Sequence, residues 1–341
     1  MRKRPNSDRT NGISRRDFLR TAAIGAAAVS VGPFAAGPAA RAADAAASTT
    51  AQTNPTVVDV RSPKWRVDGQ VDADFVRTMI DYGIRRLTGK NTVADAWRVI
   101  VKPTDVVGIK FNNLSHNYTN ANQAVLDGIV ACLTAAGVDK ERIIVTEAVG
   151  ATWHNAIAPK THPYGEPQDI GNGKAVGLSP FITDQVDCLI NVPNIKDHGG
   201  AGITGCLKNI SHSRTIMSRP MHDDACSPAI VGVNKLEVIR TKRRLNIVNG
   251  LLAIFNGGPG TGEQFRWEHN GLLFATDPVA SDRVQLELIE AERKRRGLAS
   301  LFQRGSKPKH VENAAKAGLG IADLDKINWI KAIEEGAPVP S

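Results

Sequence analysis

The feature that most constrains the fold is a strand–helix–strand alternation in the first half of the chain. Residues 106–111 form a short apolar run after a turn signal at 103–105, which predicts a buried strand. Apolar residues recur at helical spacing over 122–136, and Gly137 supplies the stop signal. A second apolar run at 142–147 predicts the next strand. This unit requires two parallel strands joined by a right-handed crossover, so the sequence predicts an α/β protein.

The rest of the chain continues the alternation. Aromatic residues make up only 5% of the sequence, which suits an α/β fold with tight turns. Residues 150–180 contain Gly, Pro and His with weak periodicity and predict a long loop excursion. We predict a mostly parallel, Rossmann-like sheet flanked by helices, built as one large domain or two lobes. Further helices are predicted over 71–87, 205–213, 278–296 and 310–317, and further strands over 187–192, 245–255 and 272–275.

The N-terminus has the pattern of an export signal. A basic start, the motif Arg-Arg-Asp-Phe-Leu at 15–19, a short apolar run and a small-x-small cleavage pattern at 40–42 follow one another. The paired arginines favour the twin-arginine route. The alternative is a membrane anchor, but the Ala- and Gly-rich run over 21–36 is shorter than the roughly 20 apolar residues of a membrane span.

This pattern predicts the domain organisation. We expect a twin-arginine signal peptide over 1–42, a disordered spacer over 43–56 and an α/β domain over 57–335. The expected location is the periplasm or the extracellular space. The twin-arginine translocase is the expected partner, and no stable membrane anchor is expected.

The positive charge of the chain is concentrated in this leader. The sequence holds 43 Lys and Arg against 34 Asp and Glu, a net charge of +9. Residues 1–42 contain 8 of the basic and 2 of the acidic residues, which leaves 35 and 32 for the remainder. That near balance argues against a nucleic-acid partner.

The four cysteines offer little guidance on a cofactor. No pair has C-x-x-C spacing, so an iron–sulfur cluster is not supported. Cys132 and Cys188 lie in apolar runs and are predicted to be buried. Cys206 and Cys226 lie in Gly-rich or polar segments and are more open to function. Export permits disulfides, and all three pairings stay open.

The densest polar cluster spans 191–212, where a predicted strand ends. Ligands gather at the carboxyl ends of strands in open α/β sheets. The backbone N–H groups of its Gly-rich part and of the helix that begins near Gly205 could receive an anion, with Lys196 and Lys208 adding charge. The spacing matches neither phosphate-loop nor dinucleotide motifs. The alternative is a Gly-rich turn with solvated lysines.

A second polar patch ends the first predicted strand. Lys110 and Asn112 lie there, and Glu147 ends the next strand at the same edge of the sheet. These side chains and the 191–212 segment could face one crevice. The alternative for Lys110 is a solvated lysine at the end of a strand. Asp277 follows another strand and is a natural N-cap for the helix after it.

Metal-capable side chains form a loose set without tight ligand spacing. The sequence argues against a site made of histidines alone, and His198 and His212 are taken as the metal candidates. The other members are His222, Asp197, Asp223, Asp224 and Cys226.

Several of these segments together resemble the domain-of-unknown-function 362 family, over roughly 100–330. The resemblance rests on the motifs at 110–112, 191–198, 204–209, 276–282 and 317–321. The family typically has Lys-Thr-His where this chain has Asp197 in the middle position, and Asp-Gly where it has Asn249-Gly250. Several relatives carry ferredoxin-like cysteine motifs that this chain lacks. The resemblance implies a shared fold and site, and no known reaction.

Two functions follow as expectations. The first is an exported enzyme whose polar site could hold a metal or a redox cofactor. The second is a binding protein that captures an anionic small molecule without chemistry. The catalytic candidates are Lys110, Lys196, His198 and Lys208. The ligand-binding candidates are Asn112, Glu147, Gly202, Thr204, Asn209 and Asp277.

Overall fold

The computed structural model describes residues 54–112, 114, 119–157, 164–212, 221–259, 262–305 and 307–333. The predicted signal peptide, most of the predicted spacer and the last two residues of the predicted domain lie outside the described residues. Thr56, assigned to the spacer, already belongs to strand β1. Among the described residues, no helix has the length and apolar character needed to cross a membrane.

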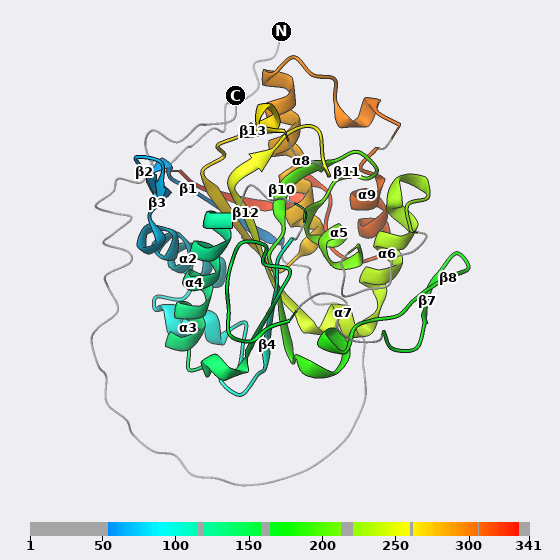
Figure 1. Ribbon diagram of the computed structural model, residues 1–341. Helices are drawn as coiled ribbons and strands as arrows, with labels where there is room; N and C mark the ends of the chain where they lie inside the picture. The colour runs from blue at the N-terminus through cyan, green and yellow to red at the C-terminus, as the bar shows by residue number, and fades with distance from the viewer. Residues whose placement is uncertain are drawn as a thin grey trace.

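One sheet of 11 strands forms the centre of the molecule (Figure 1). Eight strands follow the order β15-β1-β14-β12-β9-β4-β5-β6, and β10, β11 and β13 attach beside them. The run from β12 to β6 is parallel throughout, whereas β14 runs antiparallel between β1 and β12. The predicted mostly parallel α/β sheet is confirmed. Its strands are β1 (Thr56–Arg61), β4 (Val107–Lys110), β5 (Ile143–Thr146), β6 (Ala156–Ile157), β9 (Cys188–Asn191), β10 (Asn194–His198), β11 (Gly202–Ile203), β12 (Arg243–Ile254), β13 (Arg266–Trp267), β14 (Gly271–Ala275) and β15 (Asn328–Ile333).

Helices cover both faces of this sheet (Figure 1). The helices α2, α3 and α4 pack on one face, and α5, α6, α8 and α9 lie on the other. Separate apolar clusters fill the two layers, as expected for a doubly wound sheet. The helices are α2 (Ala73–Thr88), α3 (Val93–Arg98), α4 (Thr119–Ala135), α5 (Gly205–Ser211), α6 (Ser227–Lys235), α7 (Glu237–Lys242), α8 (Pro278–Arg295) and α9 (Lys309–Lys316).

Local sequence signals explain where the helices begin and end. The Asp72 carboxylate accepts a hydrogen bond from the Phe75 N–H at 2.9 Å and caps α2, which ends at Gly89 in the left-handed region, with φ 69°. The predicted helices over 71–87, 205–213, 278–296 and 310–317 correspond to α2, α5, α8 and α9.

The order of the strands creates a switch point at β4. From β4 the chain passes through α4 to β5 on one side, whereas β9 pairs with the opposite edge of β4 and leads on to β12. The two crossovers use helices on opposite faces of the sheet. The carboxyl ends of β4 and β9 therefore diverge from each other, and in open α/β sheets this is where ligands bind.

Several strands were absent from the sequence prediction. The strands β1 and β15 pair in parallel at one edge of the sheet, although they come from opposite ends of the described chain. The strand β10 lies within the segment expected to be a Gly-rich loop. The predicted excursion at 150–180 also contains β6 and a hairpin of β7 (Gln168–Gly171) and β8 (Lys174–Val176). A second small hairpin joins β2 (Arg66–Val67) to β3 (Gln70–Val71).

Candidate functional site

Polar side chains meet at the carboxyl ends of the central strands. The register places Lys110 of β4 beside Thr146 of β5 and Asn191 of β9, and Asn191 beside Asn246 of β12. All four residues are buried. Residues in register on parallel strands direct their side chains to the same face. The row therefore forms a polar strip across the switch point, beneath α5.

The buried amine of Lys110 is fully engaged by the protein. Its Nζ donates to the Phe111 carbonyl at 2.9 Å and to Asn209 Oδ1 at 3.0 Å, and it lies 3.4 Å from Glu147 Oε2. These acceptors match the three protons of an ammonium group. Burial lowers the pKa of Lys110, and the nearby Glu147 opposes that shift. Lys110 thus anchors the site, and no proton is left to donate to a ligand.

A chain of buried asparagines runs away from this lysine. Asn209 Nδ2 donates to Asn191 Oδ1 at 2.7 Å, Asn191 Nδ2 donates to Asn246 Oδ1 at 2.9 Å, and Asn246 donates to the Ala275 carbonyl at 3.2 Å. Each amide therefore points its oxygen toward Lys110. Aligned dipoles strengthen one another and place partial negative charge at the ammonium. Asn112 joins the chain through Asn209 Oδ1 at 3.2 Å.

The strand β10 divides its charged residues between two faces. Because side chains alternate along a strand, Lys196 and His198 share one face and Asp197 lies on the other. Lys196 Nζ donates to the Leu114 carbonyl at 3.3 Å and to Asn112 Oδ1 at 3.5 Å. Asp197 accepts from the Gly258 N–H at 2.8 Å and from Arg304 at 3.2 Å. Asp197, which differs from the middle residue of the resembled family's motif, therefore faces away from the lysines.

His198 is held in one tautomer. Its Nδ1 accepts hydrogen bonds from the N–H groups of Gly200 at 3.0 Å and Ala201 at 3.2 Å. A nitrogen that accepts cannot carry the proton, so Nε2 carries it in the neutral ring. Burial, with the charges of Lys208 and Lys196, lowers the pKa of His198 to about 2. His198 is therefore a neutral donor through Nε2, and its Nδ1 lone pair is not available to a metal.

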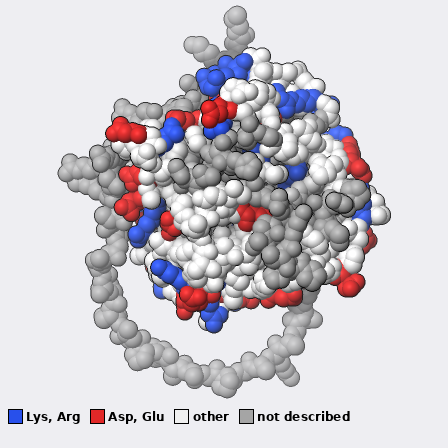
Figure 2. Space-filling view, viewed as in Figure 1, with Lys and Arg blue, Asp and Glu red and all other residues white. Residues whose placement is uncertain are grey.

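Lys208 lies in α5 close to the other two lysines. It is buried, and no other described residue forms a hydrogen bond or an ion pair with its Nζ. Burial lowers the pKa of Lys208 to about 8; the nearby Cys226 opposes this shift, and Lys110 adds to it. Burial and the Lys208 charge likewise lower the pKa of Lys196 to about 8. The three lysines are buried, so their cluster is an internal feature, and charges of both signs are interspersed on the described surface that faces the viewer in Figure 2.

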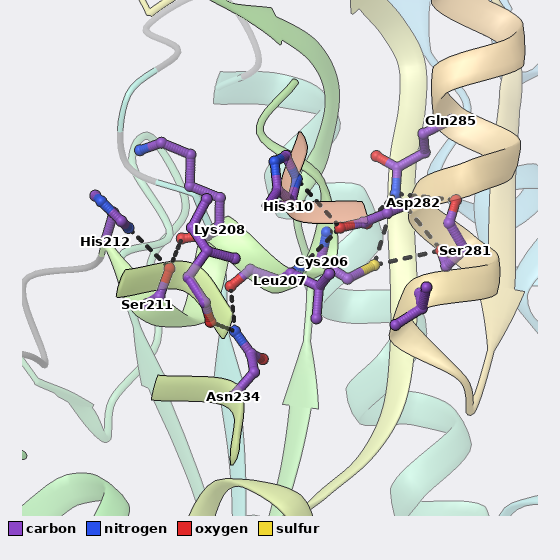
Figure 3. Close-up of polar contacts among 12 residues, drawn as sticks. Cys206, Leu207, Lys208, Ser211, His212, Asn234, Ser281, Asp282, Gln285 and His310 are labelled. Carbon is purple, nitrogen blue, oxygen red and sulfur yellow. Dashed lines mark hydrogen bonds and ion pairs between the residues drawn. The ribbon is translucent and has the colours of Figure 1, made fainter. Parts of the chain in front are cut away.

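The beginning of α5 does not offer the anion site that the sequence suggested. The Asp282 carboxylate of α8 accepts hydrogen bonds from the N–H groups of Cys206 and Leu207, the latter at 3.1 Å (Figure 3). A Cβ atom at Gly205 would lie 2.4 Å from Asp282 Oδ1. The protein's own carboxylate therefore fills this end of the helix, and the glycine is required for its close approach. Burial raises the pKa of Asp282 to about 7.

Two ligand-binding candidates have structural explanations that need no ligand. Asp277 caps α8 by accepting from Val279 and Ala280, and its second oxygen accepts from the Ile321 N–H at 3.0 Å. Gly202 has φ +79°, and a Cβ atom there would lie 2.7 Å from Pro308. Packing and capping account for both residues. Thr204 differs, because its buried Oγ1 has no hydrogen-bond partner among the described residues.

A set of metal-capable donors lies next to Lys208. The ligand atoms of His212, His222 and Cys226 all lie within 4.8 Å of one another. Of the two sequence candidates, His212 belongs to this set and His198 does not. Among the described residues, all four cysteines are free and buried, so Cys226 has no disulfide partner. Burial of Cys132 and Cys188 was predicted and is confirmed.

The structure thus brings Lys110, Asn112, Glu147, Lys196 and Asn209 together and places Lys208 close by. Sequence reasoning missed the roles of Asn191, Asn246 and Asp282. An asparagine inside an otherwise apolar strand is the signal that could have found Asn246, because a buried amide needs partners.

Comparison with protein families bears on one part of the chain. Residues 180–287 match the family model of a domain of unknown function (DUF362). This segment runs from the residues before β9 into α8 and contains Lys196, His198, Lys208 and Asn209. The match supports the resemblance noted from the motifs. No curated protein matches the chain.

Proposed function

We propose that the protein is an exported enzyme that binds a small anionic substrate at Lys208 and Lys196. The observation that carries this proposal is Lys208, a lysine that is only 6% exposed and whose Nζ forms no hydrogen bond or ion pair with any described residue. Burial of an uncompensated charge is costly, so natural proteins pair such groups. A carboxylate or phosphate group of a substrate supplies the missing partner and binds more strongly there than at an exposed lysine.

The surrounding residues take distinct roles in this proposal. Lys196 lies close enough to Lys208 for their charges to interact, so the two ammonium groups act on one anion. The Nε2–H of His198 serves as a neutral donor to the same ligand. Lys110 does not contact the substrate, because its three protons are already bound; it positions Asn209, which in turn binds Asn112.

The acidity of the two lysines favours an enzyme over a passive binding protein. Both have a pKa of about 8, so each can release and regain a proton near neutral pH. A group with a pKa near the working pH is suited to general acid–base catalysis. A binding protein would need only the charge. The twin-arginine leader, proposed from the sequence, would deliver this enzyme in folded form through the translocase to the periplasm or beyond.

Thermal unfolding of the full chain with inorganic phosphate or succinate tests the binding step. We expect either anion to raise the unfolding midpoint, since a ligand at about 100 times its Kd stabilises the folded state by about 2.7 kcal/mol. Lys208→Met should abolish the rise. Lys235→Met, at an exposed position of α6, is the matched control and should retain it. Equal responses in the wild type and Lys208→Met would refute the proposal.

A further inference from the structure

We propose that His212, His222 and Cys226 form a binding site for one divalent transition metal of the zinc type. His212 caps the C-terminal end of α5, His222 lies in the segment before α6, and Cys226 directly precedes α6 as its N-cap. Their ligand atoms lie within 4.8 Å of one another. This inference goes beyond the anion site, which needs no metal.

The donor chemistry suits such an ion. Two imidazole nitrogens and one thiolate are ligands that Zn²⁺ prefers, at about 2.0–2.1 Å and 2.3 Å. Oxygen-loving ions such as Mg²⁺ and Ca²⁺ would find no carboxylate in this set. Three protein ligands leave one position of a tetrahedral site for water or substrate, which is the arrangement of catalytic zinc sites.

The hydrogen bonds of His212 fix its tautomer, and its Nδ1 would exchange the Ser211 hydroxyl for the metal. Its Nε2 lies 2.9 Å from the Met221 carbonyl, which can only accept, so Nε2 carries the proton. Nδ1 then holds the lone pair. Metal-binding histidines commonly donate their other N–H to a backbone carbonyl in this way. The Ser211 hydroxyl now on Nδ1, at 2.8 Å, has a second acceptor in the Lys208 carbonyl at 3.5 Å.

The backbone that presents Cys226 is strained. Asp224, Ala225 and Cys226 have φ values of 43°, 57° and 61°. Three successive non-glycine residues in the left-handed region are costly, and such strain concentrates at functional sites. The turn brings the thiol to the Gly200 carbonyl, 3.7 Å away, at the beginning of α6. A structural cysteine in the core would not need this conformation.

The metal site adjoins the proposed anion site. His212 follows Lys208 by one helical turn, as the His212 N–H to Lys208 carbonyl bond of 2.9 Å shows, so both side chains lie on one face of α5. Figure 3 shows both directed away from Asp282. An anion held by Lys208 would therefore lie beside the metal, and its charge would offset the repulsion between the metal and the lysine.

Cobalt titration of the full chain, after chelator treatment, tests the inference. We expect one Co²⁺ per chain, with d–d absorption in the visible and a thiolate-to-cobalt band in the near ultraviolet, and Zn²⁺ should displace it. Cys226→Ser should remove the thiolate band, whereas Cys206→Ser should keep it. His222 is exposed, so His222→Ala should fold and weaken Co²⁺ binding by more than about 100-fold, the upper loss for contacts outside the ligand shell. His154→Ala is the matched exposed control and should bind as the wild type does.

The outcomes separate this site from the proposed function. Lys208→Met should lose the response to anions and retain the cobalt spectrum. A wild-type chain without a thiolate band, a band that persists in Cys226→Ser, or unchanged affinity in His222→Ala would overturn the metal site while leaving the anion site standing. A cobalt spectrum without an anion response would overturn the anion site alone.

Discussion

The start and the last turn of the short helix α5 differ in whether their polar groups have partners in the described structure. At its beginning, the N–H groups of Cys206 and Leu207 bind the Asp282 carboxylate, and Gln285 donates to the same carboxylate at 3.0 Å (Figure 3). In its last turn, the Lys208 Nζ forms no hydrogen bond or ion pair with any described residue. The fold therefore satisfies the polar groups at the start of α5, whereas it leaves the ammonium of Lys208 without a described partner.

This difference separates the polar residues that stabilise the fold from those that are available to bind a ligand. Backbone N–H groups bind both Asp282 and Asp277, and nearby glycines leave room for the two carboxylates. Asp282 thereby holds α5 to α8, and Asp277 caps α8. Lys208, in the last turn of α5, has an Nζ that no described residue binds. Removing a residue of the first kind should lower the stability of the fold. Removing a residue of the second kind should impair ligand binding.

The largest change in the free energy of unfolding is expected at the start of α5, where Asp282 binds the N–H groups. Asp282→Ala leaves two buried N–H groups without an acceptor, and each unsatisfied group costs about 1–3 kcal/mol. We expect a loss of about 3–5 kcal/mol in the free energy of unfolding, measured by urea denaturation. Asp325→Ala, at an exposed position, should change it by less than about 0.5 kcal/mol. A loss below about 1 kcal/mol for Asp282→Ala would mean that the helix end is not held as described.

A gain in the free energy of unfolding is expected when Lys208, in the last turn of α5, is replaced. Lys208→Met keeps the apolar stem and removes the buried charge, so in the absence of anions it should stabilise the fold at pH 7 by about 1–3 kcal/mol. The same denaturation series measures this gain. A clear destabilisation would show that Lys208 has a structural partner and would erase the contrast between the two ends.

Part of this contrast could be predicted from the sequence. Carboxyl ends of parallel strands meet at one edge, so the proximity of Lys110 and Glu147 followed from the strand–helix–strand pattern alone. The pairing of Asp282 with Cys206 joins residues 76 positions apart, and no local signal encodes it. The sequence showed glycines beside a helix start, which is also the pattern of an anion site, and only tertiary packing distinguished the two.

The missed strands have a related cause. The strand β1 pairs with β14 and β15, which lie far along the chain, so its existence depends on contacts that periodicity does not report. The strand β10 was hidden because its residues are polar: Lys196, Asp197 and His198 are buried in a strand whose composition reads as loop. Buried polar residues at a site violate the pattern that identifies strands.

The pH dependence of stability tests whether Lys208 is the unpaired charge. The pKa of Lys208 is lowered in the folded state, so between about pH 8 and its ordinary value of 10.5 the unfolded chain binds more protons. Stability due to this group therefore rises with pH across that window. The gain from Lys208→Met should shrink over the same range, and the anion response of the wild type should fall. A gain that is constant from pH 7 to 10.5 would contradict the assignment to a titrating lysine.

The smallest change in stability is expected at Asp197, which differs from the motif of the family that the chain resembles. Asp197 faces away from the lysines and binds Gly258 and Arg304, so Asp197→Asn weakens one partly exposed ion pair. We expect a loss of about 0.5–1 kcal/mol and an unchanged rise of the unfolding midpoint with phosphate. Lys196→Met, one residue earlier and on the opposite face, should diminish that rise. If Asp197→Asn impaired the anion response as strongly as Lys196→Met, both faces of β10 would contribute to anion binding, which would contradict the proposal.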